Sequence, residues 1–386
     1  MKAESHSPAP SSPIAKVLRG AFVVALVYGF LVSIRLMGSA FKAMGAETAS
    51  GLYEGIANPF AGLAVGILAT VLVQSSSTST STIVSLVGQT GGTALPLKTA
   101  IPMIMGANIG TTITNTIVSL GHIRQGGAFR RAFAAATVHD FFNLILVAIM
   151  LPVELMTGVL ERSAITLSEQ FSGVAGVERM DDPLKRLVKA GEKPIRELVE
   201  SSGLEGGALS LVLVAVALAL IAVCLVQITR NMRILISGRL EAAMNRTLGR
   251  SGILGIVVGA VLTVSVQSSS ITTSLLVPMC AAGILSLKNA FPIMLGANIG
   301  TTVTGLLASL ATDSSTGLTI ALVHTLFNLA GVLLIYPIPY FRNVPIRLAR
   351  GLAIKAQRNP AWVVAYVVGV FVVTPLLGYL LLRTAS

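Results

Sequence analysis

Long apolar segments recur from one end of the chain to the other, separated by more polar ones. Seven of them are close to the roughly 20 residues that an α-helix needs to cross a bilayer. They lie at about 16–37, 99–121, 131–152, 207–229, 287–310, 318–340 and 361–382. The pattern predicts an all-α polytopic membrane protein in which each of these segments is a transmembrane helix.

Two further apolar stretches are shorter, and each ends in a polar run. Pro59–Val73 is followed by Gln-Ser-Ser-Ser-Thr-Ser-Thr-Ser-Thr at 74–82, and Ile253–Val266 by Gln-Ser-Ser-Ser-Ile-Thr-Thr-Ser at 267–274. Polar backbone at membrane depth is tolerated only where protein or a water-filled cavity surrounds it. We therefore predict two re-entrant hairpins.

Composition supports a membrane protein. Charged residues make up 11% of the 386 residues, against about 25% in an ordinary soluble domain, and hydrophobic residues make up 53%. So few charges could not cover the surface of a cytosolic enzyme. The net charge of +12 could suggest nucleic acid, but in a membrane protein it usually reflects basic cytoplasmic loops, so no nucleic-acid partner is expected.

The loop charges predict a topology. Arginine and lysine are concentrated at 122–131, 230–250 and 341–359, whereas 38–58, 153–206 and 311–317 carry mixed or acidic charge. By the positive-inside rule the first three are cytoplasmic. This places a multi-pass protein in the cell (inner) membrane, with a cytoplasmic N-terminus and a periplasmic C-terminus.

The chain also contains an internal repeat. Lys98–Thr114 and Lys288–Thr304 are identical at eleven of 17 positions, and a Gln-Ser-Ser-Ser run precedes each. Equivalent loops of the two copies have opposite charge bias, so we predict two inverted-topology repeats, an arrangement typical of secondary transporters. The expected parts are a cytoplasmic tail (1–15), a first repeat (16–152), an extracytoplasmic linker (153–206), a second repeat (207–340), and a basic cytoplasmic loop with a final helix (341–386).

The Gln-Ser-Ser-Ser runs predict an anion site. Each offers hydroxyl, amide and backbone N–H donors without a fixed charge, and a serine run that opens a helix directs N–H groups and the positive dipole end at what lies in front of it. Two such ends would cradle an oxyanion. The neutral donors alone would leave its charge uncompensated, so co-bound cations are needed, as in a symporter.

The repeated Gly-Ala-Asn-Ile-Gly-Thr-Thr elements at 106–112 and 296–302 predict a break in a transmembrane helix in each repeat. Glycines beside asparagine allow a non-helical turn, and freed carbonyls with asparagine and threonine oxygens suit a hard cation. Asp140 is the acid well inside a predicted crossing, and its repeat equivalent is Thr325. An intramembrane carboxylate is a functional candidate, here for an additional cation.

Other interpretations remain open at this level. The serines and threonines could bond to the preceding helical turn, and the glycines could serve close helix packing. For His139 and His324, a hydrogen bond to a neighbouring helix is favoured over a proton relay. A serine hydrolase is disfavoured because no Gly-x-Ser-x-Gly element occurs, and a channel because two broken helices around one centre suit alternating access better.

These motifs resemble the type II sodium/phosphate cotransporters. The similarity rests on QSSSTSTS at 74–81, QSSSITTS at 267–274, the two GANIGTT elements, FRRAFAAATVHDFFN at 129–143 and HTLFNLAGVLLIYPIP at 324–339, and it extends over about 14–382. It implies a bacterial sodium-driven importer of inorganic phosphate that is not an enzyme and needs no cofactor besides co-transported sodium. A different oxyanion (sulfate-like or carboxylate) or proton coupling is the alternative, and a homodimer is retained as a hypothesis.

The resemblance also assigns residues. The candidate phosphate-binding residues are Gln74, Ser75, Ser76, Ser77, Gln267, Ser268, Ser269, Ser270, Asn108 and Asn298. The candidate sodium ligands are Ser76, Thr111, Thr114, Asp140, Asn143, Gln267, Ser268, Thr301, Thr304 and Asn328. Within the family, a carboxylate at the place of Asp140 marks electrogenic members, so electrogenic uptake is expected.

Overall fold

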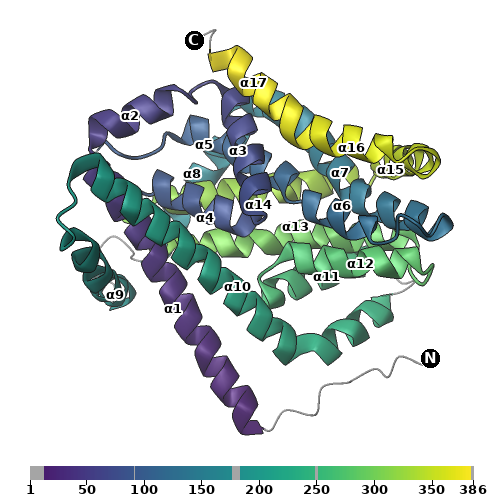
Figure 1. Ribbon diagram of the computed structural model, residues 1–386, viewed down its shortest axis with the longest axis horizontal. Helices are drawn as coiled ribbons and strands as arrows, with labels where there is room; N and C mark the ends of the chain where they lie inside the picture. Colours follow the sequence, from purple (N-terminus) through teal and green to yellow (C-terminus); the bar gives the residue numbers. More distant parts are fainter. Residues whose placement is uncertain (1–12, 91, 176–182, 248–250, 384–386) are drawn as a thin grey trace.

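The computed structural model describes residues 13–90, 92–175, 183–247 and 251–383, and these residues fold into α-helices with one short π-helical turn (Figure 1). The helices are α1 (Pro13–Met44), α2 (Ala46–Glu54), α3 (Pro59–Val73), α4 (Ser76–Val87), α5 (Leu97–Gly110), α6 (Ile113–Leu120), α7 (Gly127–Thr157), α8 (Val159–Ala175), α9 (Pro183–Glu200), α10 (Gly206–Thr247), α11 (Gly252–Val266), α12 (Ser269–Ala281), α13 (Leu287–Ser309), α14 (Thr316–Ile335), α15 (Pro339–Arg358), α16 (Ala361–Val368) and, after the turn at Gly369–Val373, α17 (Thr374–Arg383).

Within the described residues, six helical stretches are long and apolar enough to cross a membrane. They lie in α1, α7, α10, α13, α14 and the segment Ala361–Leu380, and they correspond to six of the seven predicted crossings. The seventh, 99–121, is divided between α5 and α6. Large apolar side chains such as Leu72, Val24 and Leu211 are exposed on the outside, which fits lipid-facing surfaces. The chain is a multi-pass membrane protein.

Both Gln-Ser-Ser-Ser motifs form a sharp turn between two helices. Gln74 (φ 57°) and Gln267 (φ 55°) are the only non-glycine residues with positive φ in the described part of the chain. The following Ser75 is extended and caps α4, while Thr263 in α11 bonds Thr272 in α12 across the second turn (Oγ1–Oγ1 2.9 Å). The predicted turns at both motifs are confirmed.

The predicted helix breaks are not confirmed. In the second copy α13 runs without interruption through Gly296–Thr302, so the break there is wrong. In the first copy α5 ends at Gly110 and α6 begins at Ile113, but the two residues between them, Thr111 and Thr112, keep right-handed helical backbone angles. The Gly-Ala-Asn-Ile-Gly-Thr-Thr elements therefore free few backbone carbonyls.

Close packing explains the glycines. A methyl group at Gly106 would overlap the carbonyl oxygen of Leu63 in α3, and one at Gly296 would overlap that of Ile256 in α11. At Gly300 it would stand 2.6 Å from Thr263 Cβ. Each hairpin thus packs backbone to backbone on the helix that follows it. This is the small-residue packing that the sequence left open as the alternative.

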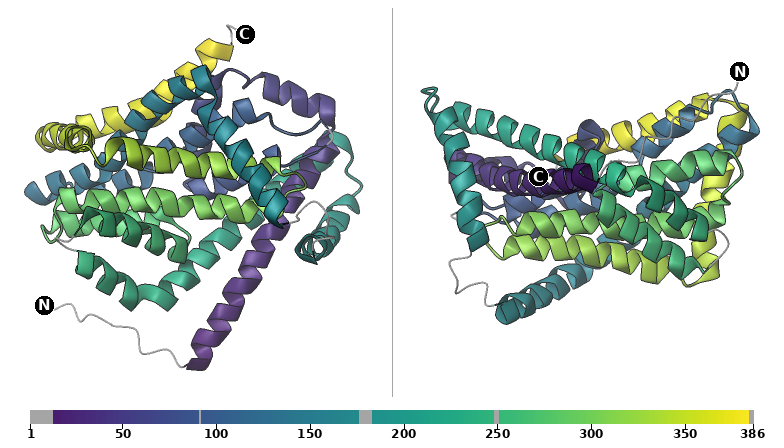
Figure 2. Two further views of the ribbon diagram at one scale, coloured as in Figure 1. Left: turned by 180° about the vertical axis from the view of Figure 1, so that it is seen from behind. Right: turned by 90° about the horizontal axis from the view of Figure 1, so that it is seen from below.

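Three segments expected as loops are largely helical. Within 153–206, α8 packs against α14 (Figure 2) and α9 forms a second helix. The basic segment 230–250 is mainly the continuation of α10 to Thr247, and 341–359 is mainly α15. Helix α15 is amphipathic: its alanines are buried and it packs on α7, while Arg347, Arg350, Lys355 and Arg358 are exposed.

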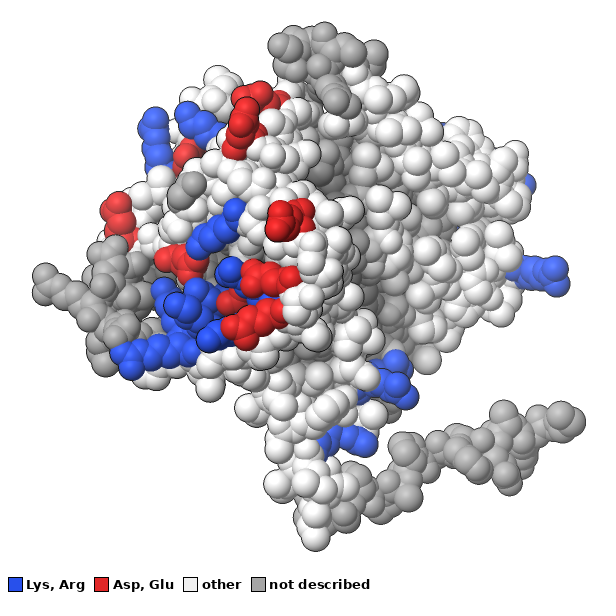
Figure 3. Space-filling view, turned by 60° about the vertical axis from the view of Figure 1, so that its left-hand side comes forward, with Lys and Arg blue, Asp and Glu red and all other residues white. Residues whose placement is uncertain are grey.

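The loops separate to two ends of the molecule. Helices α2 and α9 lie at one end, and α15 and the α6–α7 turn at the opposite end (Figure 1). Acidic and basic side chains gather at the end that carries α9, beside a broad surface without charged side chains (Figure 3). This separation matches the predicted grouping of the loops.

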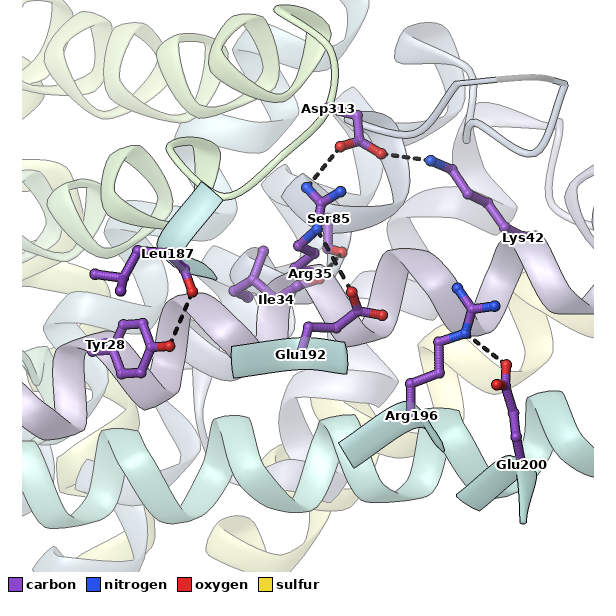
Figure 4. Close-up of polar contacts among 10 residues, drawn as sticks. All are labelled: Tyr28, Ile34, Arg35, Lys42, Ser85, Leu187, Glu192, Arg196, Glu200 and Asp313. Carbon is purple, nitrogen blue, oxygen red and sulfur yellow. Dashed lines mark hydrogen bonds and ion pairs between the residues drawn. The ribbon is translucent and has the colours of Figure 1, made fainter. Parts of the chain in front are cut away.

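A polar cluster joins three elements at the α9 end (Figure 4). Asp313, in the α13–α14 turn, accepts hydrogen bonds from Arg35 (2.8 Å) and Lys42 (2.5 Å) of α1, and Arg35 also lies 3.7 Å from Glu192 of α9. Burial alone would raise the pKa of Asp313, but the Lys42 hydrogen bond and the two positive charges lower it below its ordinary value. The same turn bonds α4, because Thr316 Oγ1 donates to Val87 O (2.8 Å).

Candidate functional site

The two Gln-Ser-Ser-Ser motifs line one cavity of about 470 Å³. Residues Gln74–Ser77 and Gln267–Ser270 enter it from the two hairpins, and α10 closes one side. Segments almost 200 positions apart in the sequence therefore meet, as the sequence predicted. The full lining is Val73–Thr78, Ala222, Leu225, Val226, Thr229, Arg230, Arg233 and Gln267–Ile271.

Two helices begin at this cavity. Ser75 Oγ accepts from Thr78 N (3.2 Å) at the start of α4, and Ser268 Oγ accepts from Ile271 N (3.4 Å) at the start of α12. Each cap leaves other first-turn N–H groups without an intrahelical partner. Together with the positive dipole ends, these N–H groups suit an anion.

Most hydroxyls of the two runs fall into two groups. Those of Ser76, Ser77, Ser269 and Ser270 make no hydrogen bond within the described residues, and all four residues line the cavity. Most hydroxyls further along bond the preceding turn, as Thr82 does to Thr78 O (2.9 Å); the exception is the buried Ser81 Oγ, which has no partner within the described residues and does not line the cavity. The first serines of each run are therefore free to bind an anion, whereas most later hydroxyls bond their own helix, so each of the two interpretations applies to different positions.

The motif glutamines contact threonines that lie two residues after the Gly-Ala-Asn-Ile-Gly-Thr-Thr elements. Gln267 Oε1 accepts from Thr304 Oγ1 (3.1 Å) and Gln74 Oε1 from Thr114 Oγ1 (3.4 Å). Two candidate sodium ligands, Gln267 and Thr304, are thus brought together, and in the other copy the candidate sodium ligand Thr114 meets Gln74, which was predicted only as a phosphate-binding residue. Thr301 and Thr111 instead donate to the carbonyls of Ala297 and Ala107, four residues earlier.

Asparagines and histidines form two matching sets between the copies. Asn298 accepts from His139 Nε2 (2.6 Å) and donates to Asn143 Oδ1 (2.8 Å). The equivalent Asn108 accepts from His324 Nε2 (3.3 Å) and donates to Asn328 Oδ1 (3.3 Å). All six side chains are buried, and each set spans both copies. Both histidines bond a neighbouring helix, as favoured from the sequence.

Asp140 lies one helical turn before Asn143 and is fully buried. Tyr366 of α16 donates to its Oδ2 (2.8 Å), while its Oδ1 and the hydroxyl of Thr116 have no partner within the described residues. Thr112 and Thr116 lie next to the carboxylate. Orphaned buried oxygens of this kind suit a small cation such as sodium.

Three contributors were missed from the sequence. Arg230 and Arg233 line the motif cavity although they belong to a segment interpreted only as a topology signal. Tyr366 reaches Asp140 from the final helix, outside both repeats. A spacing of three between the arginines, at the end of an apolar segment, could have suggested a shared helix face.

Two internally similar copies that meet around one polar cavity define a class, the polytopic secondary transporters. The chain belongs to the Na+/Pi-cotransporter family, whose model matches residues 30–178 and 207–337.

Similar proteins carry names that fit this family. Sodium-dependent phosphate transport protein 2A of Ovis aries is 33% identical, covering 93% of this chain and 67% of its own length. Sodium-dependent phosphate transport protein 2B of Homo sapiens is 33% identical over 92% of this chain and 64% of its own length. No solved structure matches this chain.

Proposed function

We propose that the protein is a secondary-active symporter that uses sodium to import inorganic phosphate. The observation that carries this function is the convergence of two helix N-termini on one cavity, together with four serine hydroxyls that have no partner among the described residues. Phosphate has four oxygens that accept hydrogen bonds, which suits several short neutral donors. The names of the relatives, which specify sodium-dependent phosphate transport, support the same substrate and coupling ion.

Charge balance is the reason for coupling. The hydrogen-bond donors of the two motifs are neutral, and burying an anion among them without compensation costs many kcal/mol. Arg230 and Arg233 supply positive charge at one side of the cavity, and sodium supplies the rest. We place sodium at Gln267 with Thr304, at the equivalent Gln74 with Thr114, and at Asp140. Asp140 Oδ1, which has no partner within the described residues, would bind an additional sodium ion, and the positive charge of that transported ion would make uptake electrogenic.

Alternating access follows from two inverted halves. The equivalent first helices of the two halves, α1 and α10, support this inverted orientation because they run in opposite directions. Helix α1 ends beside α2, whereas α10 ends on the far side of the molecule (Figure 1). The cavity reaches the exposed Arg230 and Arg233, in the segment proposed to be cytoplasmic. At the other end the Asp313 cluster and the Thr316–Val87 bond hold α1, α4, α9 and the α13–α14 turn together. We therefore assign an inward-facing state, in an inner membrane with the N-terminus inside.

Uptake of labelled phosphate into proteoliposomes, with and without an inward sodium gradient, tests the function. Ser77→Ala combined with Ser270→Ala removes one free hydroxyl from each motif and should reduce uptake at low phosphate by at least about tenfold, since a hydrogen bond to a charged group is worth about 1.5–3 kcal/mol. Thr82→Val, in the same run but bonded to its own helix, is the matched control. Sodium-independent uptake would reject the coupling.

Sulfate and proton coupling are tested in the same vesicles. A hundredfold excess of sulfate should leave phosphate uptake nearly unchanged, because hydrogen phosphate carries a donor O–H that sulfate lacks. Equal competition would point to a general oxyanion site. A proton gradient that replaces sodium fully would assign the coupling to protons instead.

A further inference from the structure

A second cavity, of about 450 Å³, lies apart from the transport motifs. Its walls come from the start of α7, the turn between α12 and α13, and α15. The elements that form these walls lie at the end of the molecule with the predicted cytoplasmic segments (Figure 1). The lining residues are Arg130, Arg131, Ala134, Cys280, Gly283, Leu285, Ser286, Leu287, Arg350 and Ile354.

Three guanidinium groups face this cavity, and none of its ten described lining residues is acidic. Arg131 is fixed at the C-terminal end of α12, where its Nε donates to Ala281 O (2.9 Å), so its charge is partly balanced by the helix dipole. Arg130 and Arg350 make no hydrogen bond or ion pair within the described residues. The cavity therefore has at least two guanidinium groups free to bind an anion.

The surroundings of the cavity are apolar and face outward. Ile354 in its wall, Ile284 in the neighbouring turn and Leu348 on α15 are 42%, 63% and 44% exposed. Trp362, just after α15, is also exposed and stacks beneath Lys355. Exposed tryptophan beside basic residues is typical of the membrane–water interface, so α15 is suited to lie at the level of lipid headgroups.

We propose that this cavity binds the phosphate group of an anionic phospholipid from the leaflet that faces the basic segments. The guanidinium groups of Arg130 and Arg350 would bind its oxygens, as arginine forks do with phosphate, while the acyl chains would cover Ile284, Leu348 and Ile354. Basic pockets between helices at the cytoplasmic side are suited to such headgroups. The bound lipid would join α7, α15 and the α12–α13 turn.

Native mass spectrometry of the full chain in neutral detergent tests this proposal. We expect the wild type to retain phosphatidylglycerol and not phosphatidylcholine, and Arg130→Gln combined with Arg350→Gln to reduce retention at least tenfold. Arg347→Gln, an exposed arginine on the same helix that does not line the cavity, should retain lipid as the wild type does. Sodium-dependent phosphate uptake by the double variant shows that it is folded.

The other outcomes would overturn the proposal. Equal retention of phosphatidylcholine would show that the headgroup charge is not recognised, and an equal loss in Arg347→Gln would show diffuse electrostatic attraction. Displacement of the lipid by millimolar inorganic phosphate would assign the cavity to free phosphate. Undiminished retention by the double variant would place the lipid elsewhere.

Discussion

Replacing Gly300 with alanine should destabilise the protein, because α13 packs against α11 with no space for a methyl group. The added Cβ would stand 2.6 Å from Thr263 Cβ and 2.7 Å from the carbonyl oxygen of Ala260, whereas ordinary contacts need about 3.4–4 Å. The two helices would have to separate by about 0.7 Å. Overpacking costs about 1–3 kcal/mol, and the upper end of this range applies because the crowding atoms are a Cβ and a backbone oxygen rather than the end of a flexible side chain. Alanine returns about 1 kcal/mol of helix propensity, which leaves a net loss of about 2 kcal/mol.

Gly305→Ala is the matched control on the same helix. Its Cβ would have no neighbour closer than 3.9 Å, so the gain in helix propensity should leave stability unchanged or slightly higher. At about 2–4 °C per kcal/mol, thermal unfolding of the detergent-solubilised protein should show Gly300→Ala about 4–8 °C below wild type. An unchanged Tm together with lost phosphate uptake would refute the packing argument and favour a role for backbone unwinding at this glycine.

Three further changes test the ion sites and the polar cluster. Asp140→Gly should abolish the current that accompanies uptake while sodium-dependent uptake remains measurable, and an unchanged current would exclude this carboxylate from charge coupling. Thr304→Val should raise the sodium concentration for half-maximal uptake at least threefold, because it removes the partner of Gln267 Oε1; a shift in phosphate affinity alone at saturating sodium would argue against a sodium site. Asp313→Asn should lower the Tm at neutral pH, because it removes a carboxylate that two cations stabilise. Since folding lowers the pKa of Asp313, the ionised carboxylate contributes its full stabilisation at pH values above the ordinary aspartate pKa of about 4. This stabilisation is lost as the pH falls through the lowered pKa. The Tm difference from wild type should therefore stay constant from pH 8 to pH 5 and close in more acidic buffer, and a difference that shrinks already between pH 8 and pH 6 would contradict this assignment.

The helical spans and both motif turns could be predicted because they depend on local pattern. Apolar length specifies the spans, and the change from apolar to polar residues at Gln74 and Gln267 marks the turns. The role of the glycines could not be predicted in the same way. Gly296 is compatible with an unwound helix and with close packing, and only the position of Ile256 O decides between them.

The lining of the cavity was predictable only in part. The repeated motifs identified the serines because repetition made a chance occurrence improbable. Arg230 lies outside the repeated motifs, so the sequence offered only the topological interpretation. Tyr366 was missed for the same reason, since its contact with Asp140 depends on how the last helix packs across α7.

The matching hydrogen bonds between the copies bear on how transport is coupled. Asn298 sits in the second copy but is bonded by His139 and Asn143 of the first, and Asn108 is bonded by His324 and Asn328 in the reverse sense. These side chains are buried, so breaking one bond without replacing it costs about 1–3 kcal/mol. A rearrangement of either half therefore disturbs the helix of the other half that carries the proposed sodium ligands. In a symporter, this reciprocal dependence opposes movement of one half relative to the other until the buried asparagine and histidine side chains have new partners. Bound sodium and phosphate would provide such partners.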